Sequence, residues 1–301
     1  MMRKPAALRQ GDVVGVIAPA AAVDESRVQA GVRALEDAGL QVRLGAATLA
    51  KSGYLAGTDR DRLTDIHDMF RDPQIKAIIA ARGGYGSGRL LPHLDIAVVR
   101  QHPKIFVGHS DLTFLLNDFV QRAGLVTFHG PMSNGLPQRP AACDFLRSLL
   151  NGKHDGWNQA AQAVIQPGTA EGVLVGGCLS IVVAMLGTPY AIETRGRLLF
   201  LEDVNEKPFR IDRMLVQLRQ AGALDEVAGV IFGEMDGCTA PGSQPVSVRD
   251  VIAEAFATAP YPVAFGLPSG HGLGTYTLPL GVRARLAGEH LTLLESPLAT
   301  T

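Results

Sequence analysis

The chain contains 301 residues, of which 47% are hydrophobic and 19% are charged, and its 28 basic residues nearly balance its 29 acidic residues. This length and composition allow two ordinary domains with sizeable cores and exclude a globally disordered chain. The net charge of −1 gives no electrostatic footprint for nucleic acid or for an anionic membrane, so neither is expected as a partner.

The three cysteines, Cys143, Cys178 and Cys238, are scattered along the sequence. Their odd number and the lack of CxxC spacing argue against a disulfide framework and against a zinc ribbon. We interpret them as small buried residues in a reducing compartment. Because no clustered His and Cys spacing exists, the sequence predicts no metal site, and no cofactor is expected.

The N-terminal region imitates a weak signal peptide, because Arg3 and Lys4 precede an apolar stretch over residues 13–23. Polar residues 10–12 interrupt that pattern, and the stretch begins like a buried strand. We therefore expect a first strand here and a cytoplasmic protein. No apolar run approaches the roughly 20 residues that a transmembrane helix needs.

The first 130 residues alternate between strand and helix patterns, as in a parallel sheet. Strands are expected over residues 13–18, 42–44, 75–81, 105–108 and 125–128, and helices over 26–38, 58–70 and 111–122. The strand at 75–81 is apolar almost throughout, which is typical of a strand buried on both faces.

A linker is predicted over residues 136–170, where prolines and glycines interrupt the pattern, with one short helix at 141–150. This divides the chain into domains over 1–135 and 171–301. In the second domain we expect strands at 172–176, 197–201, 230–232 and 262–267, helices at 179–186, 209–221 and 248–258, and a hairpin over 283–295.

Ser110 lies at the corner where the strand at 105–108 meets the following helix. A nucleophile needs this position, because its oxygen projects forward and the first helical N–H groups face any developing negative charge. Ligands of doubly wound sheets also sit beyond the carboxyl ends of the strands. The alternative is that Ser110 only caps the helix, and Leu112 leaves the G-x-S-x-G pattern incomplete.

A glycine-rich segment, residues 82–89, directly follows the strand at 75–81. Its glycines allow backbone N–H groups to approach a ligand closely. It satisfies neither G-x-G-x-x-G nor the P-loop pattern. It could instead supply an oxyanion hole together with the N–H of Asp111, or it could be a flexible turn.

Glu202 ends a very apolar strand, where a carboxylate could orient a histidine or simply meet solvent. Asp203 and Glu206 compete for the same role. We expect these carboxylates near the mouth of the second sheet.

His271 lies between two glycines after another apolar strand, so helix packing does not restrain its imidazole. A lone loop histidine can also be structural. His129 follows a strand end and is the main rival as a general base, whereas strand alternation should point His109 away from Ser110.

Taken together, these segments resemble the LD-carboxypeptidase family of serine peptidases, which also includes the microcin C immunity proteins. The matching segments follow the family's order along almost the whole chain: residues 16–19, 82–86, 108–111, 201–204, 208–215 and 270–272. Phe209 stands where the family pattern has Tyr, a change that keeps the ring.

The resemblance implies a triad in which Ser110 is the nucleophile, His271 the general base and Glu202 the orienting acid. It implies an oxyanion hole from Gly83, Gly84 and the Asp111 N–H. The candidate substrate-binding residues are Tyr85, Arg82 and Arg210, with Arg89 a further candidate for the substrate carboxylate.

The resemblance also implies a flavodoxin-like, doubly wound parallel-sheet domain, a smaller β-rich C-terminal domain and a homodimer. The implied reaction cleaves the amide between an L-centre and a C-terminal D-amino acid, releasing D-Ala from murein tetrapeptide in peptidoglycan recycling. Because the triad residues come from both predicted domains, the site is expected between them.

Two alternatives stay open. An immunity-type hydrolase of aminoacyl-nucleotide amides would need an aromatic loop, and the single tryptophan, Trp157, falls in the predicted linker. A non-catalytic ligand-binding protein of the doubly wound type would not bring the three triad residues together.

Overall fold

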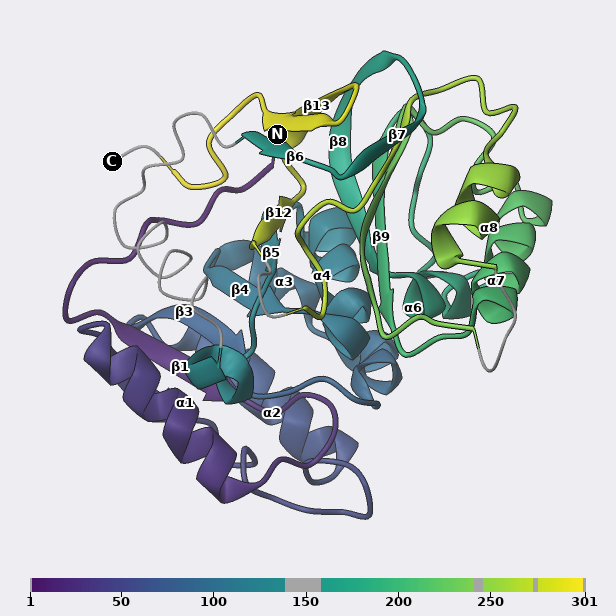
Figure 1. The fold of residues 1–301 in the computed structure, drawn as a ribbon. Coiled ribbons are helices and arrows are strands. Elements are labelled where there is room, and N and C mark those ends of the chain that lie inside the picture. The colour runs from purple at the N-terminus through teal and green to yellow at the C-terminus, as the bar shows by residue number, and fades with distance from the viewer. Residues whose placement is uncertain (1, 139–157, 241–245, 273–275, 300–301) are drawn as a thin grey trace. The chain divides into compact units, whose positions relative to one another are not determined.

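The protein is described by a computed structural model over residues 2–138, 158–240, 246–272 and 276–299 (Figure 1). The chain divides into two compact units. The first unit comprises residues 1–154, 273–281 and 296–301, and the second comprises residues 155–272 and 282–295. Each unit is built around its own sheet.

The sheet of the first unit has the order β12-β5-β4-β3-β1-β2 in the described residues. Neighbouring strands from β2 to β5 run parallel, and β12 pairs antiparallel with β5. The parallel order 2-1-3-4-5 is that of a flavodoxin-like sheet, which confirms the predicted fold class. The strands are β1 (Val13–Ile17), β2 (Gln41–Leu44), β3 (Ile75–Ala80), β4 (Ile105–Gly108), β5 (Thr127–His129) and β12 (Leu278–Leu280).

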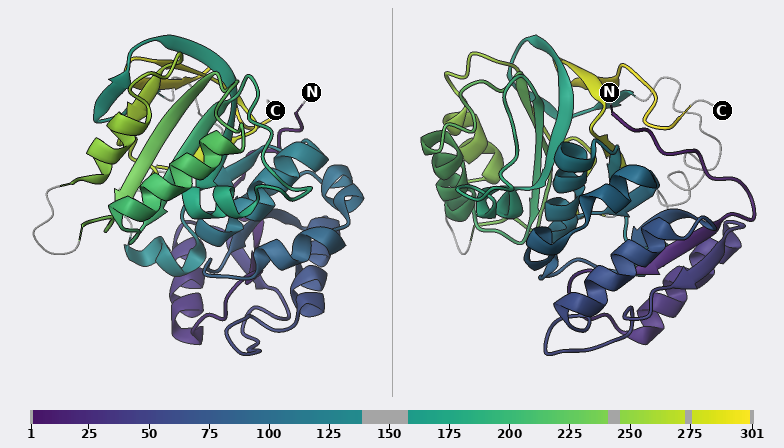
Figure 2. Two further views of the ribbon diagram at one scale, coloured as in Figure 1. Left: turned by 90° about the vertical axis from the view of Figure 1, so that its right-hand side faces the viewer. Right: turned by 180° about the vertical axis from the view of Figure 1, so that it is seen from behind.

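Helices connect these strands, and α1 and α2 cover opposite faces of the sheet (Figure 2), as right-handed crossovers require when the strand order reverses beside β1. They are α1 (Glu25–Asp37), α2 (Asp59–Arg71), α3 (Ile96–Gln101) and α4 (Thr113–Asp118). Short 3₁₀ helices are η1 (Ser87–His93), η2 (Ser110–Leu112) and η4 (Ser133–Gln138), and η3 (Phe119–Ala123) is a π-helical turn.

The core of the first unit is apolar and contains an aromatic cluster. Phe70 of α2, Phe106 of β4 and Phe119 of η3 are fully buried, with ring centroids 5.0–6.1 Å apart. Strand β3 is buried along nearly its whole length, as predicted from its unbroken apolar run. This core supports the ends of β3 and β4, where the candidate residues lie.

The second unit contains a mixed sheet, which in the described residues has the order β6-β14-β13-β8-β9-β10-β11-β7. Its centre, β8-β9-β10-β11, is parallel, and antiparallel strands extend it at both edges. The strands are β6 (Asn158–Ala160), β7 (Ala163–Gln166), β8 (Thr169–Cys178), β9 (Leu198–Val204), β10 (Gly229–Asp236), β11 (Val263–Phe265), β13 (Arg283–Ala287) and β14 (His290–Leu293).

Its helices are α6 (Leu179–Ala184), α7 (Pro208–Gln220) and α8 (Val248–Ala255). The hairpin β13–β14 forms where it was expected. Within the described part of the chain, no helix has the length and apolar character needed to cross a bilayer.

The structure differs from the sequence expectations at the domain boundaries. Within the predicted linker, residues 136–138 belong to η4, and residues 158–170 form β6, β7 and the start of β8 in the second sheet, where β6 and β7 are the edge strands of the described part. Residues 276–281 return to the first unit, because β12 pairs with β5. The helix expected at 141–150, Cys143 and Trp157 lie outside the described residues.

The helix expected at 111–122 is also divided. Three short helical pieces, η2, α4 and η3, follow one another and end at Gly124, whose φ of 67° is left-handed. The chain stays helical after Ser110, but it begins with a tight turn. The local geometry of that turn positions the serine.

Candidate active site

Ser110 occupies a sharp corner at the end of β4. Its φ is 60°, and Ser110 and Asn205 are the non-glycine residues with positive φ in the described parts of the chain. A left-handed conformation is unfavourable for a serine and is often found at functional sites. The preceding Gly108 has no room for a side chain, because a Cβ there would lie 2.9 Å from Leu112 Cβ.

This geometry argues against a helix cap as the role of Ser110. The residue that precedes η2 is His109, in extended conformation, and Ser110 is already the first residue of the turn. The strained backbone at Ser110 is compatible with the nucleophile role that the family resemblance implies, because such a residue lies on a sharp strand-to-helix turn.

The glycine-rich segment packs against this corner. A Cβ on Gly83 would lie 3.0 Å from Ser110 Cβ and 3.3 Å from Ser110 Oγ, so the backbone of the segment reaches the serine. Gly84 and Gly86 have φ of 98° and 129°, which side chains other than hydrogen rarely tolerate. The segment therefore adopts a specific conformation that needs its glycines.

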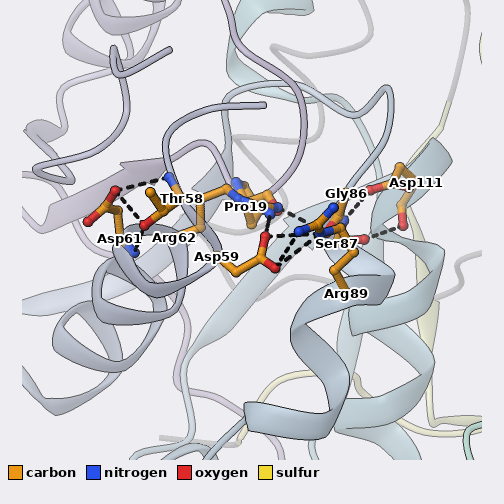
Figure 3. A network of polar contacts seen from close by, with 9 residues as sticks. All are labelled: Pro19, Thr58, Asp59, Asp61, Arg62, Gly86, Ser87, Arg89 and Asp111. Carbon is orange, nitrogen blue, oxygen red and sulfur yellow. Dashed lines mark hydrogen bonds and ion pairs between the residues drawn. The ribbon is translucent and has the colours of Figure 1, made fainter. Parts of the chain in front are cut away.

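Asp111 ties the segment to the corner. Its Oδ2 accepts a hydrogen bond from Ser87 N at 2.8 Å, and its backbone carbonyl accepts one from Ser87 Oγ at 2.7 Å (Figure 3). The Asp111 side chain is buried. The residue after the candidate nucleophile thus fixes the start of η1.

In the second unit, Glu202 and His271 form a hydrogen-bonded pair. His271 Nδ1 lies 2.6 Å from Glu202 Oε2, and the Glu202 side chain is fully buried at the end of β9. An ionised carboxylate only accepts hydrogen bonds, so in this pair His271 Nδ1 is the donor. The competing carboxylates make other contacts.

Asp203 accepts hydrogen bonds from the Ser180 and Val204 N–H groups, both at 2.8 Å, and burial raises the pKa of Asp203. Glu206 pairs with Arg210 on the first turn of α7, at 3.4 Å. The three neighbouring carboxylates therefore have different partners, which could not be distinguished from the sequence.

The loop that carries His271 is held by a second carboxylate, Glu234 of β10, which the sequence analysis missed. Glu234 Oε2 accepts a hydrogen bond from Gly272 N at 2.9 Å, and Glu234 N donates to Ser269 O at 2.9 Å. A Cβ on Gly272 would lie 2.4 Å from Glu234 Oε1. The sequence does contain a pattern that could have indicated Glu234, because this residue follows the apolar run of β10 just as Glu202 follows that of β9.

Glycine is also required before the histidine. Gly270 has a φ of 150°, and a Cβ there would lie 3.1 Å from Glu202 Oε2. The two glycines thus let the loop approach two carboxylates, whereas the sequence analysis explained them by freedom of the imidazole ring.

The rival histidines belong to the first unit and are both buried. His109 Nδ1 lies 2.9 Å from Gly130 O, so that nitrogen donates to a carbonyl. The His109 and His129 rings lie 5.9 Å apart. His109 directly follows β4, and His129 is the last residue of β5.

The candidate substrate-binding residues lie at the surface of their own units. Tyr85 is 54% exposed and makes an edge-on contact with Tyr54, with ring centroids 5.6 Å apart. Arg82 donates to Ala22 O at 3.0 Å, and Arg89 pairs with Asp59 at 2.8 Å. The Arg89 hydrogen bond, with the nearby Arg62, holds the pKa of Asp59 below its usual range.

Cys178 is not a competing nucleophile. It pairs with Glu202 across β8 and β9, and burial raises the pKa of its thiol, with the Glu202 and Asp203 charges adding to the effect. The thiol therefore stays neutral. No group of three or more His, Cys, Asp or Glu side chains suited to a metal ion occurs among the described residues.

Comparison with known proteins gives matches to both units. Residues 14–130 match the model of the LD-carboxypeptidase N-terminal domain, and residues 171–286 match that of the LD-carboxypeptidase C-terminal domain. A relative described as "Probable murein peptide carboxypeptidase", from Bacillus subtilis, is 41% identical over 94% of this chain and 91% of its own length.

The murein tetrapeptide carboxypeptidase of Pseudomonas aeruginosa is 33% identical over 92% of this chain and 94% of its own. Among solved structures, the wild-type microcin C7 self-immunity protein without ligand superposes with a TM-score of 0.90 at 25% identity, covering 99% of this chain and all of that one. Since two family models together span most of the sequence and near-full-length relatives exceed 30% identity, the chain belongs to the LD-carboxypeptidase family of serine peptidases.

Proposed function

We propose that this carboxypeptidase hydrolyses the amide between an L-centre and a C-terminal D-amino acid, and that it releases D-Ala from murein tetrapeptide in peptidoglycan recycling. The observation that carries the proposal is the 2.6 Å contact between His271 Nδ1 and Glu202 Oε2, which orients the imidazole as a carboxylate orients the base of a serine-hydrolase triad. The names of the Bacillus and Pseudomonas relatives support this choice of substrate.

In the proposed mechanism, Ser110, His271 and Glu202 act as one triad. His271 Nε2 takes the Ser110 proton as the hydroxyl oxygen attacks the amide carbon. The tetrahedral oxyanion accepts hydrogen bonds from the Asp111 N–H and from the Gly83–Gly84 backbone, each worth about 3 kcal/mol in the transition state.

Glu202 stabilises the imidazolium that forms, and its burial makes that interaction stronger than it would be in water. His271 then protonates the leaving amine as the C–N bond breaks, which leaves the shortened peptide as an ester on Ser110 Oγ. Water, deprotonated by the same nitrogen, attacks the ester carbon. The bond from that carbon to Ser110 Oγ then breaks, His271 returns the proton to Oγ, and the shortened peptide is released. This cycle uses no cofactor.

The alternative substrate is an aminoacyl-nucleotide amide, as the similarity to the microcin C7 self-immunity structure suggests. The relative with that name is 27% identical, compared with 41% for the murein peptide carboxypeptidase relative. This difference favours the peptide substrate. A homodimer remains a prediction from the family resemblance, and a cytoplasmic location remains a prediction from the N-terminal sequence.

Mass spectrometry of the purified protein with murein tetrapeptide tests the proposal. We expect release of D-Ala and about a hundredfold slower release of L-Ala from the matched peptide, because inverting Cα costs a charged hydrogen bond worth about 2–3 kcal/mol. Ser110→Ala and His271→Ala should each lower the rate about 10⁴-fold or more.

The controls are His129→Ala and His109→Ala, which should retain turnover in the folded protein. Equal rates on the two termini would refute the stereospecific reaction and leave a serine hydrolase. Loss of turnover in His129→Ala alone would refute the assignment of the base. Cleavage of an aspartyl-nucleotide amide in place of the peptide would establish the alternative.

A further inference from the structure

One peptide bond in the glycine-rich segment is held from both sides. The carbonyl of Gly86 accepts a hydrogen bond from Arg62 Nη1 at 2.9 Å, and the N–H of the next residue, Ser87, donates to Asp111 Oδ2 at 2.8 Å (Figure 3). The C=O and N–H of a trans peptide point to opposite edges of one rigid plane. The two contacts therefore fix the orientation of the Gly86–Ser87 plane.

Arg62 is itself held in place. Its side chain is fully buried, and Nη1 also donates to Pro19 O at 2.7 Å, two residues beyond β1. Nη2 pairs with Asp59, which in turn binds Arg89 at 2.8 Å. The close approach depends on glycine, because a Cβ on Gly86 would lie 2.9 Å from Arg62 Nη1.

The segment needs such an anchor. Gly84 and Gly86 have positive φ, and a backbone with glycines on both sides of Tyr85 can rotate with little steric resistance. Oxyanion donors contribute to rate only when they are already in position as charge develops. Burial of a guanidinium is costly, and Arg62 Nε has no hydrogen-bond partner among the described residues, so the contacts of Nη1 and Nη2 must offset that cost.

We propose that Arg62 is a positioning residue for the reaction: together with Asp111 it clamps the Gly86–Ser87 peptide plane and so holds the Gly83–Gly84 backbone beside Ser110. Arg62 does not touch the substrate, because it is buried. The inference rests on the proposed role of Gly83 and Gly84 as oxyanion donors.

The geometry also explains why the residue is arginine. A guanidinium fork reaches two carbonyl oxygens and a carboxylate at once, whereas a lysine ammonium is a single point on a flexible stem. Arg62→Lys should therefore keep the buried charge and still lose part of the clamp.

The first test is steady-state kinetics on murein tetrapeptide. We expect Arg62→Ala to lower kcat about 10²-fold, comparable to the loss of one oxyanion donor, with little change in KM. Millimolar guanidinium should restore part of kcat by filling the space, and Arg62→Lys should fall between the two. The matched control is Arg43→Ala. Arg43 lies on β2 of the same unit and pairs with Asp72. This variant should keep its kcat and should not respond to guanidinium.

The second test does not depend on activity. Hydrogen exchange of the segment around Ser87 should rise at least about tenfold in Arg62→Ala and less in Arg62→Lys, while the strands of the first unit stay protected. Unchanged kcat and unchanged exchange in folded Arg62→Ala would overturn the clamp. Exchange that rises across the whole unit, without guanidinium rescue, would assign Arg62 a purely structural role and also overturn it.

These outcomes separate the two proposals. If the wild-type protein does not release D-Ala, the proposed substrate is wrong, and the exchange experiment still decides whether the clamp exists. If Arg62→Ala does not fold, Arg62→Lys keeps the charge and supplies both measurements.

Discussion

At the scale of single residues, the backbone of the candidate nucleophile is strained. Ser110 has a left-handed φ of 60°, a conformation that glycine adopts without steric strain. Residues held in such conformations cost about 1–3 kcal/mol and persist where the surroundings determine them. Here the surroundings are the tight contact of Gly108 with Leu112 and the contact of Gly83 with the serine itself. We infer that the strained backbone lowers the folding stability of the first unit and in return presents the Ser110 hydroxyl at the corner.

This inference predicts that Ser110→Gly is more stable than Ser110→Ala. We expect a difference in unfolding free energy of about 1 kcal/mol, since glycine relieves the strain that alanine keeps. Urea denaturation of the two inactive variants measures it. At Ser26, an exposed position in the first turn of α1, the same pair of substitutions should show the opposite order, because glycine is a poorer helix former than alanine. Equal stability of the Ser110 variants would show that the corner is unstrained.

At the scale of elements, α2 connects the fold to the candidate site. Its N-terminus is capped by Thr58 and Asp61, each side chain accepting from the other's backbone N–H. At its C-terminus, Lys104 Nζ donates to Met69 O at 2.7 Å and to Asp72 O. A helix held at both ends can present Arg62 to the glycine-rich segment with little freedom.

The contact between α2 and α3 should make the stability of the first unit depend on pH. Asp95 N, at the start of α3, donates to His67 Nε2 at 3.0 Å, so that nitrogen must be unprotonated. Burial, assisted by Arg71, lowers the pKa of His67 below 6.5. Below about pH 6.5, His67 is therefore protonated in the unfolded chain but stays neutral in the folded chain. The unfolding free energy consequently falls as the pH drops below about 6.5.

Urea denaturation between pH 7.5 and pH 5 measures this effect against His67→Gln, in which the other titrating groups cancel. We expect the advantage of the wild-type protein to shrink by about 1 kcal/mol, the net worth of one hydrogen bond. An advantage that stays constant or grows toward acid pH would show that the folded protein accepts the protonated ring.

At the scale of the whole molecule, the chain leaves the second unit and returns to the first. Strand β12 pairs with β5, and Leu298, near the C-terminus, is buried while Ala299 N donates to Pro5 O. The C-terminal part of the sequence therefore contributes to both cores. The sequence analysis placed all of residues 171–301 in one domain, because a short edge strand such as β12 carries no long hydrophobic pattern.

Two buried leucines, close in sequence, test this division. Leu278→Ala in β12 should destabilise the first unit by about 2–4 kcal/mol, whereas Leu291→Ala in β14 should destabilise the second by a similar amount. Hydrogen exchange locates the effect: Leu278→Ala should expose β5, and Leu291→Ala should expose β13. Exposure of the same strands by both substitutions would contradict the two-unit description.

Much of this architecture was predictable from the sequence, for a local reason. The alternation of apolar strands and amphipathic helices predicted the parallel core strands of both sheets, because burial of each element imposes its own period on the residues. Functional side chains at strand ends, such as Ser110 and Glu202, were predictable because ligands of parallel sheets bind there. The family resemblance supplied their roles.

Only the tertiary structure decided which residues meet across long distances in sequence. Glu202, rather than Asp203 or Glu206, contacts His271, and Glu234 holds the same loop from the neighbouring strand. Arg62 lies on the same face of α2 as Ile66 and Met69, but it carries a charge, and its full burial depends on carbonyl and carboxylate partners that the helix pattern does not reveal. Short edge strands carry too little hydrophobic pattern to be recognised, and a buried charge depends on partners supplied by other parts of the chain.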